Sequence, residues 1–168
     1  MAELTTSERL QPALLDRLTD DEPDKKMESR DRRVMSMRFL RQAVLRDLGW
    51  LLNAPARPLD DEIHEFPLVD KSVLNYGLPD LTGLTISGIR AGRMEQMVFD
   101  AIANFEPRIM RKTLAVAAGR SDEASGGHNR VQFEISGDLC PLPMPEALLV
   151  RTEVDLETGR SEVKEGGA

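Results

Sequence analysis

The sequence predicts an α+β protein in which N-terminal helices pack against a small C-terminal antiparallel β-sheet. Two observations lead to this prediction. Before residue 106, apolar residues recur at every third or fourth position in two long stretches, which is the spacing of an amphipathic helix. Beyond residue 112 they recur at every second position, which is the spacing of a half-buried strand. Helices followed by strands, without regular alternation, are typical of the α+β class.

Residues 1–33 are polar and rich in charge, and we expect them to form an arm outside a single α+β domain over residues 34–165. Within the arm, four leucines are spaced as one face of a short helix: Leu10, Leu14, Leu15 and Leu18. The acidic run that ends in Pro23 stops this helix. A helix of about eight residues needs a surface to pack on. The stripe is therefore either a chance pattern in a frayed terminus or an arm that docks its leucines on a partner.

Residues 36–53 have the clearest helical pattern. The apolar face consists of Met37, Leu40, Val44, Leu48, Leu51 and Leu52. Gly49 lies inside this helix and should cost about 1 kcal/mol relative to alanine. Pro55 and Pro58 end it, because proline cannot continue a helix. The locally basic stretch from Arg30 to Arg46 is either a solvated surface or a docking surface for an acidic partner.

Residues 59–88 contain several turn formers, among them Gly77 and Pro79. A second long helix is predicted from about Arg90 to Phe105. Its apolar face consists of Met94, Met97, Val98, Ala101, Ile102 and Phe105. A stripe that carries methionines is typical of a core face. The dipeptide Glu106-Pro107 ends the helix.

The remaining chain predicts four strands. The first is expected over residues 113–117, and the second contains the alternating apolar residues Val131, Phe133 and Ile135. The third alternates from Leu148 to Leu156, and the last follows at residues 161–164. The tetrapeptide over residues 157–160 predicts a tight hairpin turn in which Gly159 has a positive φ.

Composition excludes several functional classes. The 168 residues hold 29 acidic against 22 basic side chains, for a net charge of −7, which disfavours binding to nucleic acid or anionic membranes. The chain has a single cysteine, Cys140, and two histidines, His64 and His128, which leaves few ligands for a metal centre. The first residues lack the features of a signal peptide, and no stretch approaches the roughly 20 apolar residues of a membrane span. We therefore expect a cytoplasmic protein without metal or cofactor.

The one compact polar constellation is Glu106-Pro107-Arg108, just beyond the second long helix. In an extended segment, Glu106 and Arg108 would point to the same side. They would then either pair with each other as a helix stop beside the sheet or each pair with a partner chain. A rigid acid and base beside a proline suit a specific docking site.

Five segments of the chain carry a family resemblance: Leu10–Pro23, Val44–Asn53, Ser72–Asp80, Phe105–Ile109 and Val150–Gly159. Taken in this order, they resemble the TssE family of baseplate subunits in bacterial type VI secretion systems. That family is similar to the small wedge protein of contractile phage tails, historically called lysozyme-like. The resemblance extends from about Leu10 to Val163, and Glu106, Pro107 and Arg108 match the family's signature triplet.

The resemblance implies a non-enzymatic structural subunit of a hetero-oligomeric baseplate, located in the cytoplasm and docked at the inner membrane. It implies contacts with the wedge subunits TssF and TssG and with the sheath of TssB and TssC, whose assembly the subunit would help to initiate. The family's sheet is similar to a sheath domain that exchanges strands with its neighbours. We therefore expect a sheet edge to accept a strand, and the triplet and the four arm leucines to contact partners.

Two alternatives are a peptidoglycan-cleaving, lysozyme-like enzyme and a nucleic-acid binder. In the enzyme, Glu106 would be the catalytic acid, but the neighbouring Arg108 favours the ionised carboxylate over the protonated acid that catalysis needs. A thiol nucleophile formed by Cys140 with a histidine is disfavoured, because Cys140 lies in a stiff proline-rich linker. The basic stretch up to Arg46 would have to bind nucleic acid despite the overall acidity and few aromatic residues.

Overall fold

The computed structural model describes residues 13–19, 24, 37–58, 60–80, 91–119, 130–139 and 146–166. Along the chain the elements are α1 (Leu14–Leu18), α2 (Met37–Asn53), η3 (Glu62–Glu65), α3 (Pro67–Asp70), η4 (Val73–Asn75), α4 (Ala91–Phe105), β1 (Ala115–Gly119), β2 (Arg130–Leu139), β3 (Glu146–Asp155) and β4 (Ser161–Glu165). Helices precede a four-stranded antiparallel sheet, which confirms the α+β prediction.

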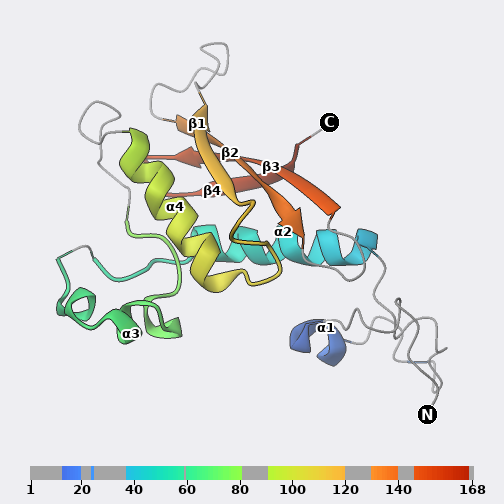
Figure 1. Cartoon of the computed structure of the whole chain (residues 1–168), viewed down its shortest axis with the longest axis horizontal. Coiled ribbons are helices and arrows are strands. Elements are labelled where there is room, and N and C mark those ends of the chain that lie inside the picture. The colour runs from blue at the N-terminus through green and yellow to red at the C-terminus, as the bar shows by residue number, and fades with distance from the viewer. Residues whose placement is uncertain are drawn as a thin grey trace.

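The four strands form a meander in the order β1-β2-β3-β4. β2 and β3 pair along their whole length, with Ile135 opposite Val150 and Phe133 opposite Thr152. The short strands β1 and β4 form the two edges. Helices α2 and α4 lie against the same sheet, α2 packing on β4 and α4 on β1 (Figure 1).

The core lies between this helical layer and one face of the sheet, and it includes most of the residues that the apolar periodicity predicted. Met37, Met97 and Phe105 are only partly buried against it. On the sheet, the buried side chains are Val131, Phe133, Ile135, Leu139, Leu148, Val150, Thr152, Val154 and Leu156. On the helices, they are Leu40, Ala43, Val44, Leu48, Leu51, Leu52, Met94, Val98, Ala101 and Ile102. Gly49 faces away from this packing, since an added Cβ would meet no atom within 4 Å.

The first strand begins two residues later than the sequence predicted. Thr113 lies in a turn, where its N–H donates to the Met110 carbonyl at 3.0 Å. Its hydroxyl accepts from the N–H of Asp138 at 2.8 Å. These bonds withdraw Thr113 from the ladder, so β1 starts at Ala115. The hairpin is confirmed: Gly159 has φ +69°, and its N–H donates to the Asp155 carbonyl at 2.8 Å.

Residues 56–77 form a closed loop that contains η3, α3 and η4; Leu59 lies outside the described residues. Two backbone hydrogen bonds tie its base, from Leu78 N–H to the Ala54 carbonyl at 2.9 Å and from Ala56 N–H to the Leu78 carbonyl at 2.8 Å. Gly77 has φ +125°, and a Cβ there would lie 2.1 Å from the Ala54 oxygen. Only glycine fits this close approach.

The arm is represented by α1 and by Asp24 among the described residues. Helix α1 begins at Leu14 because Ala13 is non-helical, with φ −58° and ψ 158°. The helix is therefore shorter than predicted, and Leu10 lies outside the described residues. The division into an arm over 1–33 and a domain over 34–165 stays a prediction.

Candidate functional site

The Glu-Pro-Arg triplet forms a tight turn at the junction of α4 and the sheet. The Glu106 N–H still donates to the Ile102 carbonyl, as in a helix, and the Glu106 carbonyl accepts from the Ile109 N–H at 3.2 Å. Pro107 occupies the second position of this turn, which its fixed φ favours. Ile109 then forms a bridge to Leu139 at the end of β2. The segment is a turn rather than an extended strand, and it aligns α4 with the sheet.

Within this turn, Glu106 and Arg108 bind each other directly. The Glu106 carboxylate accepts from the Arg108 N–H at 3.1 Å, from Nε at 2.7 Å and from Nη2 at 2.5 Å. Glu106 is only 3% exposed. Its charge is tolerated there because the guanidinium neutralises it and supplies the donors. Of the two arrangements that the sequence left open, an internal pair is therefore formed.

Arg108 also joins the turn to α2. Its Nη2 lies 2.6 Å from Oδ2 of Asp47. Burial of the guanidinium lowers the pKa of Arg108, but the hydrogen bonds and charges of Glu106 and Asp47 outweigh this and raise it. Arg108 therefore remains a cation that binds two acids, Glu106 at the end of α4 and Asp47 on α2.

The charge cluster continues from Asp47 to the arm. Arg46 donates from Nε to Asp47 at 2.9 Å and from Nη1 to Asp16 of α1 at 2.5 Å. The Asp16 side chain is 1% exposed, so α1 is anchored by a buried acid. The Arg46 guanidinium also lies 5.0 Å from the ring centre of Trp50, within cation–π range. We call Asp16, Arg46, Asp47, Glu106 and Arg108 the charge cluster.

A recess of about 410 Å³ opens beside the charge cluster. Its apolar walls come from Leu15, Trp50, Leu51, Tyr76, Phe105 and Pro107. Tyr76 and Phe105 meet edge to face, with ring centres 5.3 Å apart. Burial, followed by the negative charges of Asp47 and Glu106, raises the pKa of Tyr76. The recess thus combines an apolar wall with fixed charges, an arrangement that suits protein recognition.

The three described arm leucines do not enter the core. Leu14 and Leu18 are 69% and 74% exposed, and Leu15 is half exposed at the rim of the recess. The arm is therefore attached through Asp16 while its leucines remain accessible. The structure brings Leu15 to the triplet and leaves Leu14 and Leu18 facing outward.

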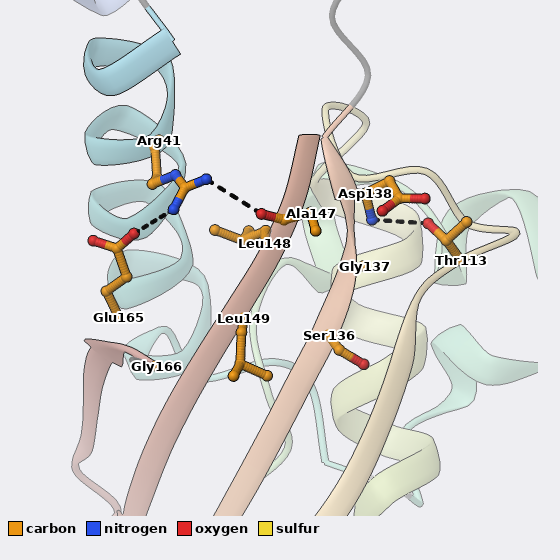
Figure 2. A pocket seen from close by; sticks show the side chains of 10 residues that line it. All are labelled: Arg41, Thr113, Ser136, Gly137, Asp138, Ala147, Leu148, Leu149, Glu165 and Gly166. Carbon is orange, nitrogen blue, oxygen red and sulfur yellow. Dashed lines mark hydrogen bonds and ion pairs between the residues drawn. The ribbon is translucent and has the colours of Figure 1, made fainter. Parts of the chain in front are cut away.

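A second, larger hollow of about 700 Å³ lies on the sheet near the N-terminal end of α2 (Figure 2). Arg41 closes one side, where it bonds to Glu165 of β4 at 2.6 Å and also contacts Glu146 and the Ala147 carbonyl. Leu149, Ser136 and Asp138 line the hollow. Arg41 thereby fixes the end of β4 to the start of β3. This polar, open hollow contains none of the site residues that the sequence predicted.

Sequence reasoning missed Asp16, Arg46 and Asp47 as site residues. Asp47 and Arg108 are far apart in the chain, and only the packing of α2 beside the turn brings them together. The adjacent opposite charges of Arg46 and Asp47 are common on solvated helix faces, so they gave no specific signal.

His64 is a structural residue of the 56–77 loop. Its two ring nitrogens lie 2.8 Å from the Pro58 carbonyl and 2.7 Å from Asp70 Oδ1. His128 and Cys140 lie outside the described residues. Among the residues that the structure describes, no group of three or more His, Cys, Asp or Glu side chains is arranged to hold a metal ion. None of the described helices has the length and apolar character needed to cross a membrane.

Comparison with known proteins gives one family. A family model described as "Baseplate wedge protein gp25" matches residues 38–140. The matched range runs from α2 to the end of β2 and contains the Glu-Pro-Arg triplet, Arg46 and Asp47. No curated protein and no solved structure matches the chain.

Proposed function

The chain belongs to the baseplate wedge protein gp25 family, and on that basis we propose that it is a structural subunit of a type VI secretion baseplate. In this role it joins the wedge subunits TssF and TssG to the sheath of TssB and TssC and helps to initiate sheath assembly. The observation that carries the proposal is the family match over the α2, α4 and triplet region. The same family match also fits a wedge protein of a contractile phage tail. The genes that neighbour this one would distinguish a secretion baseplate from a phage tail.

The recess beside the charge cluster supports a docking role for this region. Nη1 of Arg108 is buried and has no hydrogen-bond partner in the part of the chain that the structure describes. A buried donor without an acceptor costs about 1–3 kcal/mol, so the cluster contains a polar group that the described chain does not satisfy. We infer that a wedge subunit docks on the recess, where the charged side chains of Arg46, Asp47 and Arg108 lie beside its apolar walls. The outward-facing Leu14 and Leu18 would extend the same contact.

The part of the β4 edge that follows Ser161 supports the proposed strand addition from the sheath. The side chain of Asn53 occupies both backbone groups of Ser161, accepting from its N–H at 3.0 Å and donating to its carbonyl at 2.9 Å. The N–H and C=O groups of Ser161 therefore point away from β3. By the two-residue period of the ladder, those of Val163 and Glu165 do the same. Arg41 holds the end of this strand in place. At the opposite edge, Glu95 caps the Ala118 N–H at 2.7 Å.

The geometry of Glu106 favours this assembly role over peptidoglycan cleavage. A glycosidase needs two carboxyl groups that flank the substrate, one of them protonated. Both oxygens of Glu106 instead accept hydrogen bonds from Arg108, and the nearby Asp47 binds the same guanidinium. We expect purified protein to release no soluble fragments from peptidoglycan. Release that disappears in Glu106→Gln, with folding intact, would overturn the assembly proposal.

Assembly is tested in cells that lack the chromosomal gene and carry a fluorescent sheath subunit. Restoring the wild-type chain should restore sheath foci, and tagged chain should co-purify with TssF and TssG as identified by mass. Glu106→Ala and Arg108→Ala should each leave a folded, soluble chain but reduce foci, whereas Lys112→Ala, at an exposed position nearby in the chain, should not. Unfolding of both triplet variants would show that the triplet is merely structural. Normal foci in cells without the chain would contradict the proposal.

A further inference from the structure

The 56–77 loop exposes an unusual amount of apolar surface. Five large apolar side chains on or between its three short helical turns are exposed: Phe66, Leu68, Val69, Val73 and Leu74. Leu68 and Val73 are 90% and 79% exposed, and no residue of η3, α3 or η4 is buried. Clustered apolar exposure of this kind marks an interaction surface. We call these five residues the apolar knob.

The apolar knob projects away from the sheet. In Figure 1, α3 lies well clear of the four strands, beyond the helical layer. Helix α3 packs against both η3 and η4. A projecting surface fits a concave partner, so its natural complement is a groove.

The loop holds the knob in a defined conformation. His64 bridges Pro58 and Asp70, and the Asn75 side chain donates to Asp70 Oδ1 at 2.9 Å. Asn75 also accepts from the Arg57 N–H at 3.0 Å, which ties the two ends of the loop together. Because these bonds fix the loop before it meets a partner, little conformational entropy remains to be lost on binding.

The surroundings of the knob are acidic. Asp60, Glu62 and Glu65 are exposed on the loop, while its exposed basic residues are Lys71 and Arg57. Arg57 lies 3.9 Å from Asp61 and is therefore already near a carboxylate. A second copy would bring the same acidic rim against this one, and like charges disfavour that contact. An anionic lipid surface is disfavoured for the same reason.

We propose that the apolar knob inserts into an apolar groove of another baseplate protein whose rim carries lysine or arginine side chains. The aliphatic side chains and Phe66 fill the groove, and the acidic rim pairs with the basic one. This inference rests on the proposed function, because it requires the chain to join a baseplate. It adds a second contact surface to the one beside the charge cluster, since the two are formed by different side chains.

The first arm of the test locates the partner surface. A photo-crosslinking amino acid is placed at position 68 or, as a control, at the exposed Thr158 of the hairpin. After irradiation in cells, the tagged chain is purified and the crosslinked peptides are mapped. Position 68 should crosslink to an apolar segment flanked by lysine or arginine, and position 158 should not. A crosslink to a second copy, or to a segment without basic residues, would overturn the proposal.

The second arm measures the contribution of the knob. The baseplate protein that carries the crosslink is purified and titrated with wild-type chain, Leu68→Asp, Leu68→Met and Glu65→Lys. Leu68→Asp should weaken binding at least tenfold, Leu68→Met should leave it within about twofold, and Glu65→Lys should weaken it and reduce its salt dependence. All variants should retain the wild-type circular dichroism and melting temperature, since these side chains are exposed.

The two proposals fail in different ways. If Leu68→Asp binds and co-purifies as well as the wild type, the knob proposal is wrong and the baseplate role stands. If the wild-type chain itself joins no baseplate protein, the proposed function fails and the knob proposal falls with it.

Discussion

Arg108 folds back onto Glu106, two residues earlier, and donates three hydrogen bonds to its carboxylate at 2.5–3.1 Å. The proline between them closes the turn that makes this possible. Because Arg108 also binds Asp47 of α2, one guanidinium fixes the position of the turn relative to the helical layer.

This pairing predicts unequal effects of removing its two members. Arg108→Ala leaves the buried Glu106 without its counter-ion and should lower the free energy of unfolding by about 3 kcal/mol. Glu106→Ala leaves Arg108 bound to Asp47 and should cost less. The double variant should be no worse than Arg108→Ala, because the two residues act as one unit. Urea unfolding of all three variants measures this, with Lys112→Ala as the control. Equal, additive losses would contradict the cluster as described.

Gly49 and Gly77 predict opposite responses to alanine. Gly49→Ala adds a methyl group to open space within a helix and should raise the free energy of unfolding by about 0.5–1 kcal/mol. Gly77→Ala forces a Cβ against the Ala54 carbonyl at positive φ and should strongly destabilise the chain or prevent folding. The urea midpoints of the two variants provide the test. A stable Gly77→Ala protein would mean that the loop base adopts another conformation.

The 56–77 loop should become less stable as the pH rises through the titration of His64. The Pro58 carbonyl and the Asp70 carboxylate raise the pKa of His64 above its ordinary value of 6.5, so protonation stabilises the folded loop. This contribution is complete below the pKa of the unfolded chain and is lost as the pH rises through the raised value. An NMR titration should place the His64 pKa above 6.5. His64→Gln should remove the pH dependence of exchange protection at Asn75, and an unshifted titration would refute the explanation.

Deleting residues 1–20 should change the melting temperature little while weakening wedge binding. The deletion removes Asp16, but Arg46 keeps Asp47 and its contact with Trp50, so no charge is stranded. The stability loss should be small, because the deletion leaves no buried charge without a partner. The matched variant Asp16→Asn retains the arm but removes the carboxylate charge that binds Arg46. Thermal scans and wedge pull-downs compare this variant with the deletion. A large loss of stability on deletion would show that the arm belongs to the domain core.

Replacing Val163 by proline should impair sheath assembly without preventing folding. Val163 directs its N–H away from β3, so Val163→Pro removes an edge donor without breaking a ladder bond. Lys164→Pro removes a donor to β3 and should destabilise the sheet. We expect Val163→Pro to remain folded but to lose sheath foci. Normal foci in a folded Val163→Pro protein would exclude this edge as the site of strand addition.

The sequence by itself determined the fold class and most of the core. Period-two alternation from Val131 to Leu156 fixed which face of β2 and β3 is buried, since a shift by one residue would expose every apolar side chain. Helical spacing did the same for α2 and α4, and Gly159 specified its turn. These features are local, because each depends on residues within one turn or one strand. The Glu-Pro-Arg triplet was also visible, since its members are adjacent.

Only the tertiary structure decided what surrounds the triplet. Asp47 and Asp16 reach the cluster because α2 and α1 pack beside the turn. The spacing of apolar residues does not predict contacts between residues so far apart in the chain. The start of β1 shifted because the Thr113 hydroxyl bonds to Asp138 on another strand. The exposure of the apolar knob was not predicted from the sequence either. Sequence patterns assign apolar residues to a core by default, whereas the closed base at Gly77 and Leu78 holds Leu68 and Val73 in solvent.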